Sequence, residues 1–213
     1  MKVAELWRYP VKGLRGEQLE RLEIAADGIP GDRSLRVLDS RGIVTGRRKQ
    51  RMVGLPATLS SDGDPLVDGH PWDSSEAAAS IRDVAGASAK LSRSIGGHEY
   101  DAAPILLLSD GSLAQLGYDR RRFRANIVLE GADGPVEQAW LGSRVRLGDL
   151  VLAVEQPCER CVITTIDPDT IEVDLDVLRR ANDELDGIMG VYCSVVEPSA
   201  VSVGDPVDQI VGG

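Results

Sequence analysis

Short strand-like segments separated by turn residues recur along the whole chain and constrain its fold more than any other feature. Clusters of Gly, Pro, Asp and Ser interrupt these segments, for example at Ser40-Arg41-Gly42 and at Gly148-Asp149. The expected strands are residues 3–11, 19–24, 34–39, 43–45, 89–94, 105–108, 126–130, 144–147, 150–154, 189–196 and 201–211. Strands that recur every ~8–12 residues are typical of a β-barrel or a sandwich rather than of alternating strand–helix units.

Helix signals occur in only three segments. Residues 75–85 are rich in alanine, follow serines that can cap the first turn, and end before Gly86. Residues 110–116 follow Ser109, another potential cap, and end before Gly117.

The third expected helix covers residues 174–185, where three leucines fall on one stripe: Leu175, Leu178 and Leu185. The sequence therefore predicts an α+β, β-rich fold in which a few helices lie at the periphery. A flexible stretch at Ile95-Gly96-Gly97-His98 marks the expected boundary between two modules.

Two of the three cysteines, Cys158 and Cys161, are separated by two residues in a polar segment that follows a predicted strand. A structural zinc site needs four soft ligands, but the chain offers only Cys193, His70 and His98 in addition, and these lie far apart in sequence. Zinc is thus disfavoured by the spacing.

A redox pair of the thioredoxin type should begin a helix, which lowers the thiol pKa. Residues 162–166 are instead largely β-branched and favour a strand. The cysteines could also be buried and inert, although Glu159 and Arg160 between them predict a polar, partly open loop. The pair by itself leaves these alternatives open.

Composition is that of an ordinary soluble globular protein, with 42% hydrophobic and 27% charged residues in 213. No window reaches the ~20 apolar residues that cross a bilayer, and Glu5 and Arg8 interrupt the N-terminal apolar run. Three cysteines do not make a disulfide framework. We expect a cytoplasmic protein with no membrane association.

The net charge of −10 argues against nucleic-acid binding, which requires a basic face. Two basic runs nevertheless stand out, Arg47-Arg48-Lys49-Gln50-Arg51 and Arg120-Arg121-Arg122-Phe123-Arg124. Most of these arginines are expected to be solvated surface charges. A few could line an anion pocket, because the guanidinium group binds phosphate well.

Six stretches, in order along nearly the whole chain, resemble the MOSC superfamily, which is named after the C-terminal domain of molybdenum cofactor sulfurases. They are Tyr9-Pro-Val-Lys12, Gly31-Asp-Arg33, Arg122-Phe-Arg-Ala-Asn-Ile-Val128, Pro157-Cys-Glu-Arg-Cys-Val-Ile-Thr-Thr-Ile-Asp-Pro-Asp-Thr170, Gly190-Val-Tyr192 and Val203-Gly-Asp-Pro-Val207. The chain is most similar to the amidoxime-reducing branch. The resemblance implies an N-terminal MOSC β-barrel module over residues 1–95 and a MOSC β-barrel domain over residues 96–213, with the site between them.

The resemblance also implies a molybdenum cofactor, Mo-molybdopterin, with Cys161 as the thiolate ligand of the metal. Sulfur is a soft ligand that suits such a centre. Cofactor contacts are expected from Lys12, Arg33, Ala103, Arg124, Asn126, Glu159 and Tyr192, and a role in proton transfer or substrate positioning from Asp101. The implied reaction is reduction of small N-hydroxylated compounds such as hydroxylamines, amidoximes and N-hydroxylated bases.

Two departures from the family pattern are visible. Gly13 follows Lys12 where the family commonly has Ser, and Arg48 stands where the family has Glu, which we expect to alter the substrate entrance. No cysteine set for an iron–sulfur cluster is present. Electrons should then come from a separate protein, such as a cytochrome b5-like protein, a ferredoxin or a flavin reductase.

Two other functions remain open from the sequence. One is a sulfur- or cofactor-carrier module in which Cys161 holds a persulfide. The other is a β-barrel interaction domain in which the cysteines are buried and unreactive.

Overall fold

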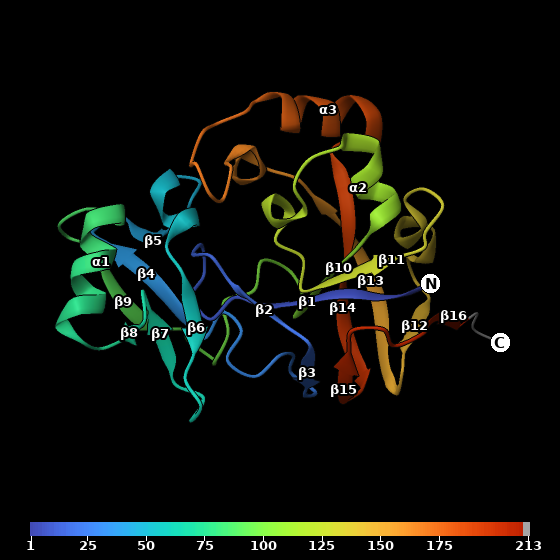
Figure 1. The fold of residues 1–213 in the computed structure, drawn as a ribbon, viewed down its shortest axis with the longest axis horizontal. Helices are drawn as coiled ribbons and strands as arrows, with labels where there is room; N and C mark the ends of the chain where they lie inside the picture. Colours follow the sequence, from blue (N-terminus) through green and yellow to red (C-terminus); the bar gives the residue numbers. More distant parts are fainter. Residues whose placement is uncertain (211–213) are drawn as a thin grey trace.

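The computed structural model describes residues 1–210 and shows two lobes side by side along the long axis of the molecule (Figure 1). One lobe contains β4 to β9 and α1, and the other contains the large sheet with α2 and α3. The predicted α+β, strand-rich fold is confirmed. Parts of the expected strand 201–211 and of the module 96–213 lie outside the described residues.

The larger lobe is built on one eight-stranded sheet. Its order is β16 (Val207–Ile210), β12 (Arg144–Leu147), β13 (Leu150–Glu159), β14 (Ile188–Glu197), β10 (Ile105–Ser109), β11 (Ile127–Glu130), β1 (Lys2–Arg8) and β2 (Glu17–Leu19). All neighbours are antiparallel except β10 and β11, which are parallel.

Three smaller sheets contain the other strands of residues 1–210. β3 (Arg21–Ile24) pairs with β15 (Ser199–Ser202). In the smaller lobe, β5 (Gly42–Val44), β4 (Leu35–Asp39) and β9 (Lys90–Arg93) form one sheet, and β6 (Ala57–Leu59), β7 (Pro65–Val67) and β8 (His70–Pro71) form another.

Helices lie at the periphery, as predicted. They are α1 (Ser75–Ala85), α2 (Asp110–Leu116), α3 (Asp176–Leu185) and four 3-10 helices, η1 (Gln50–Gly54), η2 (Arg120–Phe123), η3 (Val136–Trp140) and η4 (Val162–Thr165). The first two α-helices have the predicted bounds. The hydroxyl of Ser74 accepts the Ala77 N–H at the start of α1, and the hydroxyl of Ser109 accepts the Ser112 N–H at the start of α2.

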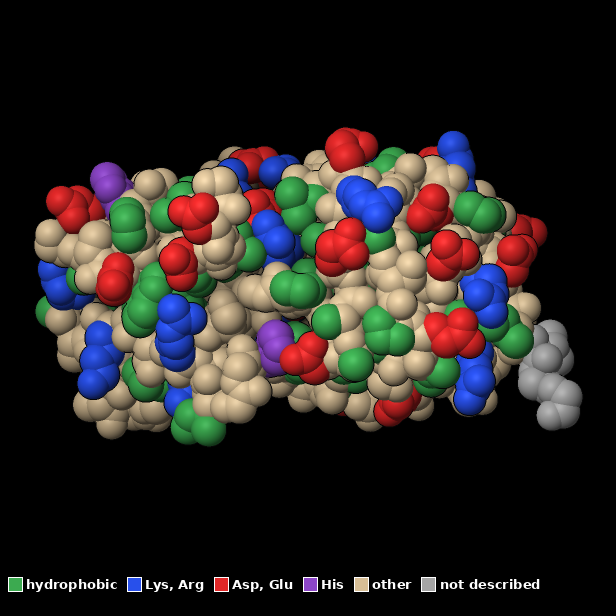
Figure 2. Space-filling model, turned by 90° about the horizontal axis from the view of Figure 1, so that it is seen from below, with side chains coloured by type: hydrophobic (Ala, Val, Ile, Leu, Met, Phe, Trp, Pro, Cys, Tyr) green, Lys and Arg blue, Asp and Glu red, His purple; other side chains and the backbone are tan. Residues whose placement is uncertain are grey.

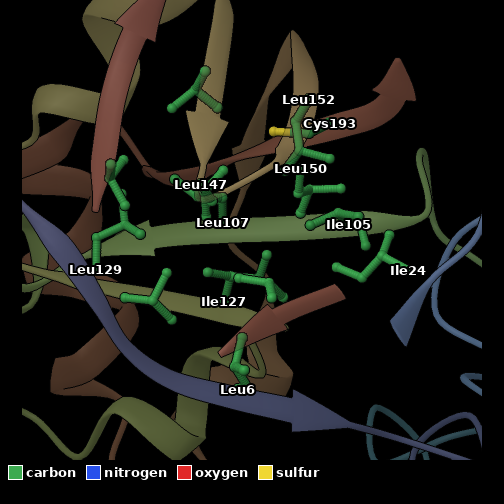
Figure 3. Close-up of a cluster of buried hydrophobic side chains, with 14 of the residues drawn as sticks. Leu6, Ile24, Ile105, Leu107, Ile127, Leu129, Leu147, Leu150, Leu152 and Cys193 are labelled. Atoms are coloured by element: carbon green, nitrogen blue, oxygen red, sulfur yellow. The ribbon is translucent and has the colours of Figure 1, made fainter. Parts of the chain in front are cut away.

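Each lobe has its own hydrophobic core. In the larger lobe, apolar side chains from β1, β10, β11, β12 and β13 form one cluster that includes Leu6, Leu107, Ile127 and Leu152 (Figure 3). A second cluster in the smaller lobe joins Val37 of β4 to Ile81 of α1. The first 29 residues contribute to the core of the larger lobe, although most of that core lies beyond residue 105. The division into modules at residue 95 stays a prediction.

Several expected strands have different bounds. The segment 19–24 is two strands, because β2 pairs with β1 whereas β3 turns away to pair with β15. The first strand ends at Arg8 and not at residue 11, since the chain enters a turn at Pro10. The segment 201–211 is likewise divided between β15 and β16.

The third helix also differs from the prediction. It begins at Asp176, and its buried residues are Val177, Ala181 and Leu185, whereas Leu175 is 67% exposed. The buried positions are four residues apart and so lie on one helix face. The leucine stripe was therefore wrong at its first position.

The expected strand after Cys161 is the 3-10 helix η4. The hydroxyl groups of Thr164 and Thr165 donate to the carbonyl groups of Cys161 and Val162, three residues earlier, at 2.9 and 2.7 Å. Such local side-chain hydrogen bonds compete with strand pairing and here close a tight turn. The residues before Cys161, expected to be a loop, continue β13 as far as Glu159 because the long strand β14 pairs with them.

Charged side chains are interspersed on the face shown in Figure 2, where Lys and Arg alternate with Asp and Glu. Within residues 1–210, no helix is long and apolar enough to cross a membrane.

Candidate functional site

A cleft with a volume of about 110 Å³ is lined by residues from both lobes. All nine residues that the sequence analysis selected line it: Lys12, Arg33, Asp101, Ala103, Arg124, Asn126, Glu159, Cys161 and Tyr192. These residues lie up to 180 positions apart in the chain. The tertiary fold thus brings the whole predicted set to one place, while the role of each residue stays a prediction.

Cys161 presents its thiol at this cleft. It lies between the end of β13 and the start of η4, is half-buried, and has its carbonyl held by the backbone N–H of Thr164 at 3.0 Å. Cys158, in contrast, is 2% exposed and packs in a hydrophobic cluster with Phe123 and Met189. The two cysteines therefore have different environments, and Cys161 is the more accessible of the pair.

Arg160 fixes the segment between the two cysteines. Its guanidinium group donates to the carbonyl of Met189 at 2.7 Å and to the carbonyl of Phe123 at 2.8 Å, and it lies over the Phe123 ring. The sequence analysis expected this residue to make the loop polar and open. It instead folds inward and ties the loop to β14 and η2, which rigidifies the support of Cys161.

Gly190 of β14 lies close to Arg160 and to the neighbouring strand β10, where there is no room for a side chain. Its φ is +80°, and a Cβ atom at this position would lie 2.7 Å from the carbonyl oxygen of Leu107 and 3.3 Å from Arg160. Any larger residue would push β14 away from β10 or displace the Arg160 side chain.

A buried polar network holds Arg33. The side chain of Asp32 is buried, accepts the Tyr9 N–H at 2.6 Å, and pairs with the Arg33 guanidinium. Asn126 accepts from Arg33 at 3.0 Å and from the Leu106 N–H at 3.2 Å. Its NH₂ group donates to the Trp7 carbonyl and to Asp32. Asn126 thus has its hydrogen-bonding capacity filled by protein groups and acts on the cleft by positioning Arg33.

Two arginines stack on the ring of Tyr9. The guanidinium carbon of Arg33 lies 4.7 Å and that of Arg124 lies 4.5 Å from the ring centroid. Burial raises the pKa of Tyr9 to about 12, so its phenol stays neutral. The hydroxyl donates to the carbonyl of Ala125 at 3.2 Å.

Arg124 makes no ion pair and no side-chain hydrogen bond with any of residues 1–210. Burial lowers its pKa, and the nearby Arg33 cation acts in the same direction. A desolvated cation without a carboxylate partner is costly. An anion bound in the cleft would remove this cost.

Lys12 pairs with Asp101 across the entrance. Its ammonium group donates to Asp101 Oδ1 at 2.7 Å and to the carbonyl of Glu99 at 2.9 Å. Burial favours the neutral form of Asp101, but the hydrogen bond and charge of Lys12, with Arg47 and Arg33, outweigh it and lower the pKa of Asp101. Asp101 is therefore a carboxylate at neutral pH.

Replacement of Lys12 by methionine is expected to raise the pKa of Asp101, because burial then acts with less opposition. In the native protein, the Lys12–Asp101 pair stabilises the fold fully at pH values above the usual pKa of a carboxyl group. This stabilisation is lost as the pH falls through the lowered pKa of Asp101. Carboxyl ¹³C NMR titration of the apoprotein measures the shift. Lys2→Met, which removes a surface partner of Glu130, should leave Asp101 unchanged; an equal effect of both variants would contradict this account.

Arg47 is a cleft residue that the sequence analysis did not select. The adjacent Arg48, which was expected to alter the substrate entrance, pairs with Asp39 at 2.5 Å and does not line the cleft. Burial tends to lower the pKa of Arg47, but the nearby Cys161 and Asp101 outweigh it and raise that pKa. The arginine of this basic run that faces the cleft is thus one position earlier than predicted, and the basic run itself was a signal for it in the sequence.

The remaining predicted residues lie on the rim and walls. Tyr192 projects from β14, and burial together with the adjacent Cys158 raises its pKa. Ala103 precedes β10, and Glu159 ends β13. In total, five basic side chains face the cleft against three carboxylates, in a chain of net charge −10.

The cleft can therefore receive an anion at Arg124 and present a soft sulfur ligand at Cys161. A zinc ion would need several protein ligands. Within residues 1–210, no group of three or more His, Cys, Asp or Glu side chains could hold a metal ion in this way. Cys193, the third cysteine, is buried in the core of the larger lobe.

Comparison with known protein families covers almost the whole chain. Residues 1–95 match the MOSC N-terminal beta barrel domain, and residues 96–208 match the MOSC domain. Among curated relatives, mitochondrial amidoxime reducing component 2 of Macaca fascicularis is 28% identical over 98% of this chain and 83% of its own length. Mitochondrial amidoxime-reducing component 1 of Homo sapiens is 26% identical over 96% and 82%.

Among solved structures, the YuaD protein of Bacillus subtilis superposes with a TM-score of 0.52. The match covers 97% of this chain and 93% of that protein, at 17% sequence identity. This likeness supports the fold.

Proposed function

The chain belongs to the MOSC domain family, and we propose that it is a molybdenum-cofactor-dependent reductase of small N-hydroxylated compounds. The observation that carries this proposal is the placement of Cys161: its half-buried thiol shares one cleft with Arg124, a desolvated cation that lacks a partner within residues 1–210. A soft metal ligand and an anion receptor are what a phosphorylated, dithiolene-bearing metal cofactor needs.

The residues of the cleft fit such a cofactor. Arg124 and Arg33, both stacked on Tyr9, would bind its phosphate and polar edges, and Lys12 would contribute a third cation. Cys161 would hold the molybdenum, and Arg160 and Thr164 keep the Cys161 loop in place. Asn126 would act through Arg33.

Bound in this cleft, the molybdenum centre would supply the two-electron chemistry, as cofactors generally do for difficult redox steps. Conversion of an N–OH group to N–H and water consumes two electrons and two protons. Asp101 lies at the entrance as a carboxylate hydrogen-bonded to Lys12. Asp101 would position the substrate or relay protons to the departing oxygen.

The electrons would come from a separate redox protein, because residues 1–210 contain three cysteines that do not form a cluster site. A cytochrome b5-like protein, a ferredoxin or a flavin reductase remains the proposed donor. A cytoplasmic location also stays a prediction, and the relatives reported above carry mitochondrial names.

The test is metal and activity analysis of the full chain produced in a host that makes the cofactor. We expect about one molybdenum and one pterin phosphate per chain, and conversion of benzamidoxime to benzamidine when a chemical reductant supplies electrons. A chain that never retains molybdenum, and on which Cys161 is trapped as a persulfide, would instead support the sulfur-carrier function.

A further inference from the structure

Two arginines of the cleft form neither an ion pair nor a side-chain hydrogen bond to a backbone carbonyl within residues 1–210, and they lie at different depths. Arg124 is half-buried against Tyr9, whereas Arg47 is exposed and comes from the turn between β5 and η1. The other cations of the cleft are engaged: Lys12 with Asp101, Arg33 with Asp32, and Arg160 with backbone carbonyls. Two separate anion-binding positions are therefore available.

Arg47 differs from its neighbours in the basic run: it forms no ion pair with a carboxylate of the described chain, and its side chain lies beside the Cys161 thiol. Arg48 pairs with Asp39 at 2.5 Å, and Arg51 pairs with Asp83 at 2.6 Å, so the other two arginines of this basic run are neutralised on the surface. Only Arg47 of the run lines the cleft, where Cys161 is also found.

The carboxylates of the cleft do not neutralise Arg47. Asp101 is held by Lys12, and Glu99 is held by Arg36 at 2.8 Å. The third, Glu159, forms no ion pair with Arg47 in the described chain. The entrance beside Cys161 thus presents one positive charge to an incoming molecule.

We propose that Arg47 selects substrates that carry a carboxylate, so that the preferred compounds are N-hydroxylated carboxylic acids. This inference rests on the proposed function. The planar guanidinium can bind a carboxylate through two parallel hydrogen bonds. One unpaired cation beside three carboxylates matches a monoanion better than a doubly charged phosphate.

Arg47 is distinguished from the cofactor-binding cations by position. The proposed phosphate receptor is Arg124, supported by Arg33 on the same aromatic ring. Arg47 belongs to a different element of the other lobe and is exposed to solvent. It can contact the part of a substrate that remains outside the cleft.

The test compares two substrates that differ only in charge, benzamidoxime and 4-carboxybenzamidoxime, with the cofactor-loaded protein. We expect the native protein to favour the carboxylated compound in kcat/KM, mainly through KM. Arg47→Ala should reduce this preference by up to about fivefold, the upper end of the range for one exposed ion pair, and Arg47→Glu should reverse it. Arg47→Lys should retain most of it, and Arg48→Ala should leave it unchanged.

Two further measurements separate the possible outcomes. Molybdenum content should be the same in the native protein and Arg47→Ala; its loss would mean that Arg47 holds the cofactor and would overturn the inference. Equal effects of Arg47→Ala on both substrates would also overturn it. If neither compound is reduced, the proposed function fails, whereas calorimetric titration with benzamidine and 4-carboxybenzamidine still decides whether Arg47 selects the carboxylate.

Discussion

Protein carrying Cys161→Ala is expected to contain almost no molybdenum after purification, whereas Cys158→Ala should retain the native content. Cys161 is the half-buried cysteine of the cleft, and its removal deletes the soft ligand that we propose for the metal. Cys158 is 2% exposed and faces a hydrophobic cluster. Replacement of Cys158 removes apolar contacts in this cluster but leaves the proposed metal ligand, Cys161, in place. Elemental analysis per chain measures the difference.

The matched pair also controls for folding. Cys158→Ala should destabilise the protein more than Cys161→Ala, because it leaves a small cavity in a packed core. Thermal unfolding of both apoproteins checks this order. Equal molybdenum content in the two variants, or loss in Cys158→Ala alone, would contradict the assignment of Cys161 as the ligand.

Replacement of Asp32 by alanine is expected to destabilise the fold by about 3–5 kcal/mol, the range for breaking a buried pair by removal of one partner. The Asp32 side chain accepts from the Tyr9 N–H, Arg33 and Asn126, and it is fully buried. Without it, the Arg33 guanidinium and the Tyr9 N–H would lose their main acceptor in the interior. Denaturant titration measures the loss of unfolding free energy.

Two further variants serve as controls for this prediction, one conservative and one on the surface. Asp32→Asn keeps the shape and one acceptor oxygen, so it should destabilise the protein less than Asp32→Ala. Asp83→Ala removes an exposed partner of Arg51 and should leave the unfolding curve unchanged. A similar, small effect of all three substitutions would show that the Asp32 network contributes little to the stability of the fold.

The elements that the sequence predicted accurately are those specified by local chemistry. Helix α1 occupies residues 75–85 as expected, because Ser74 and Gly86 terminate it through contacts within one turn. The hairpin of β12 and β13 follows from Gly148 and the alternating residues on either side. The family signature likewise selected nine residues that share one cleft.

The errors arose where particular contacts of the folded chain override the propensity of the segment. The β-branched stretch after Cys161 favours a strand, but the segment forms η4 because the Thr164 and Thr165 hydroxyl groups bond to the backbone three residues earlier. Leu175 looks like a core residue in sequence, yet helix α3 buries Val177 instead. In each case the choice depends on which partners are within reach in the folded chain.

The sequence by itself determined the strand-rich class, the capped helices and the set of residues at the site, since these follow from local propensity and motif. Only the tertiary structure decided that Cys161 is half-buried whereas Cys158, which also lines the cleft, is almost fully buried, that Arg47 rather than Arg48 lines the cleft, and that Arg124 has no ion-pair partner within residues 1–210. The physical reason is that burial and charge pairing depend on segments far apart in the chain, such as Asp32 and Asn126, which meet only after the lobes have packed together.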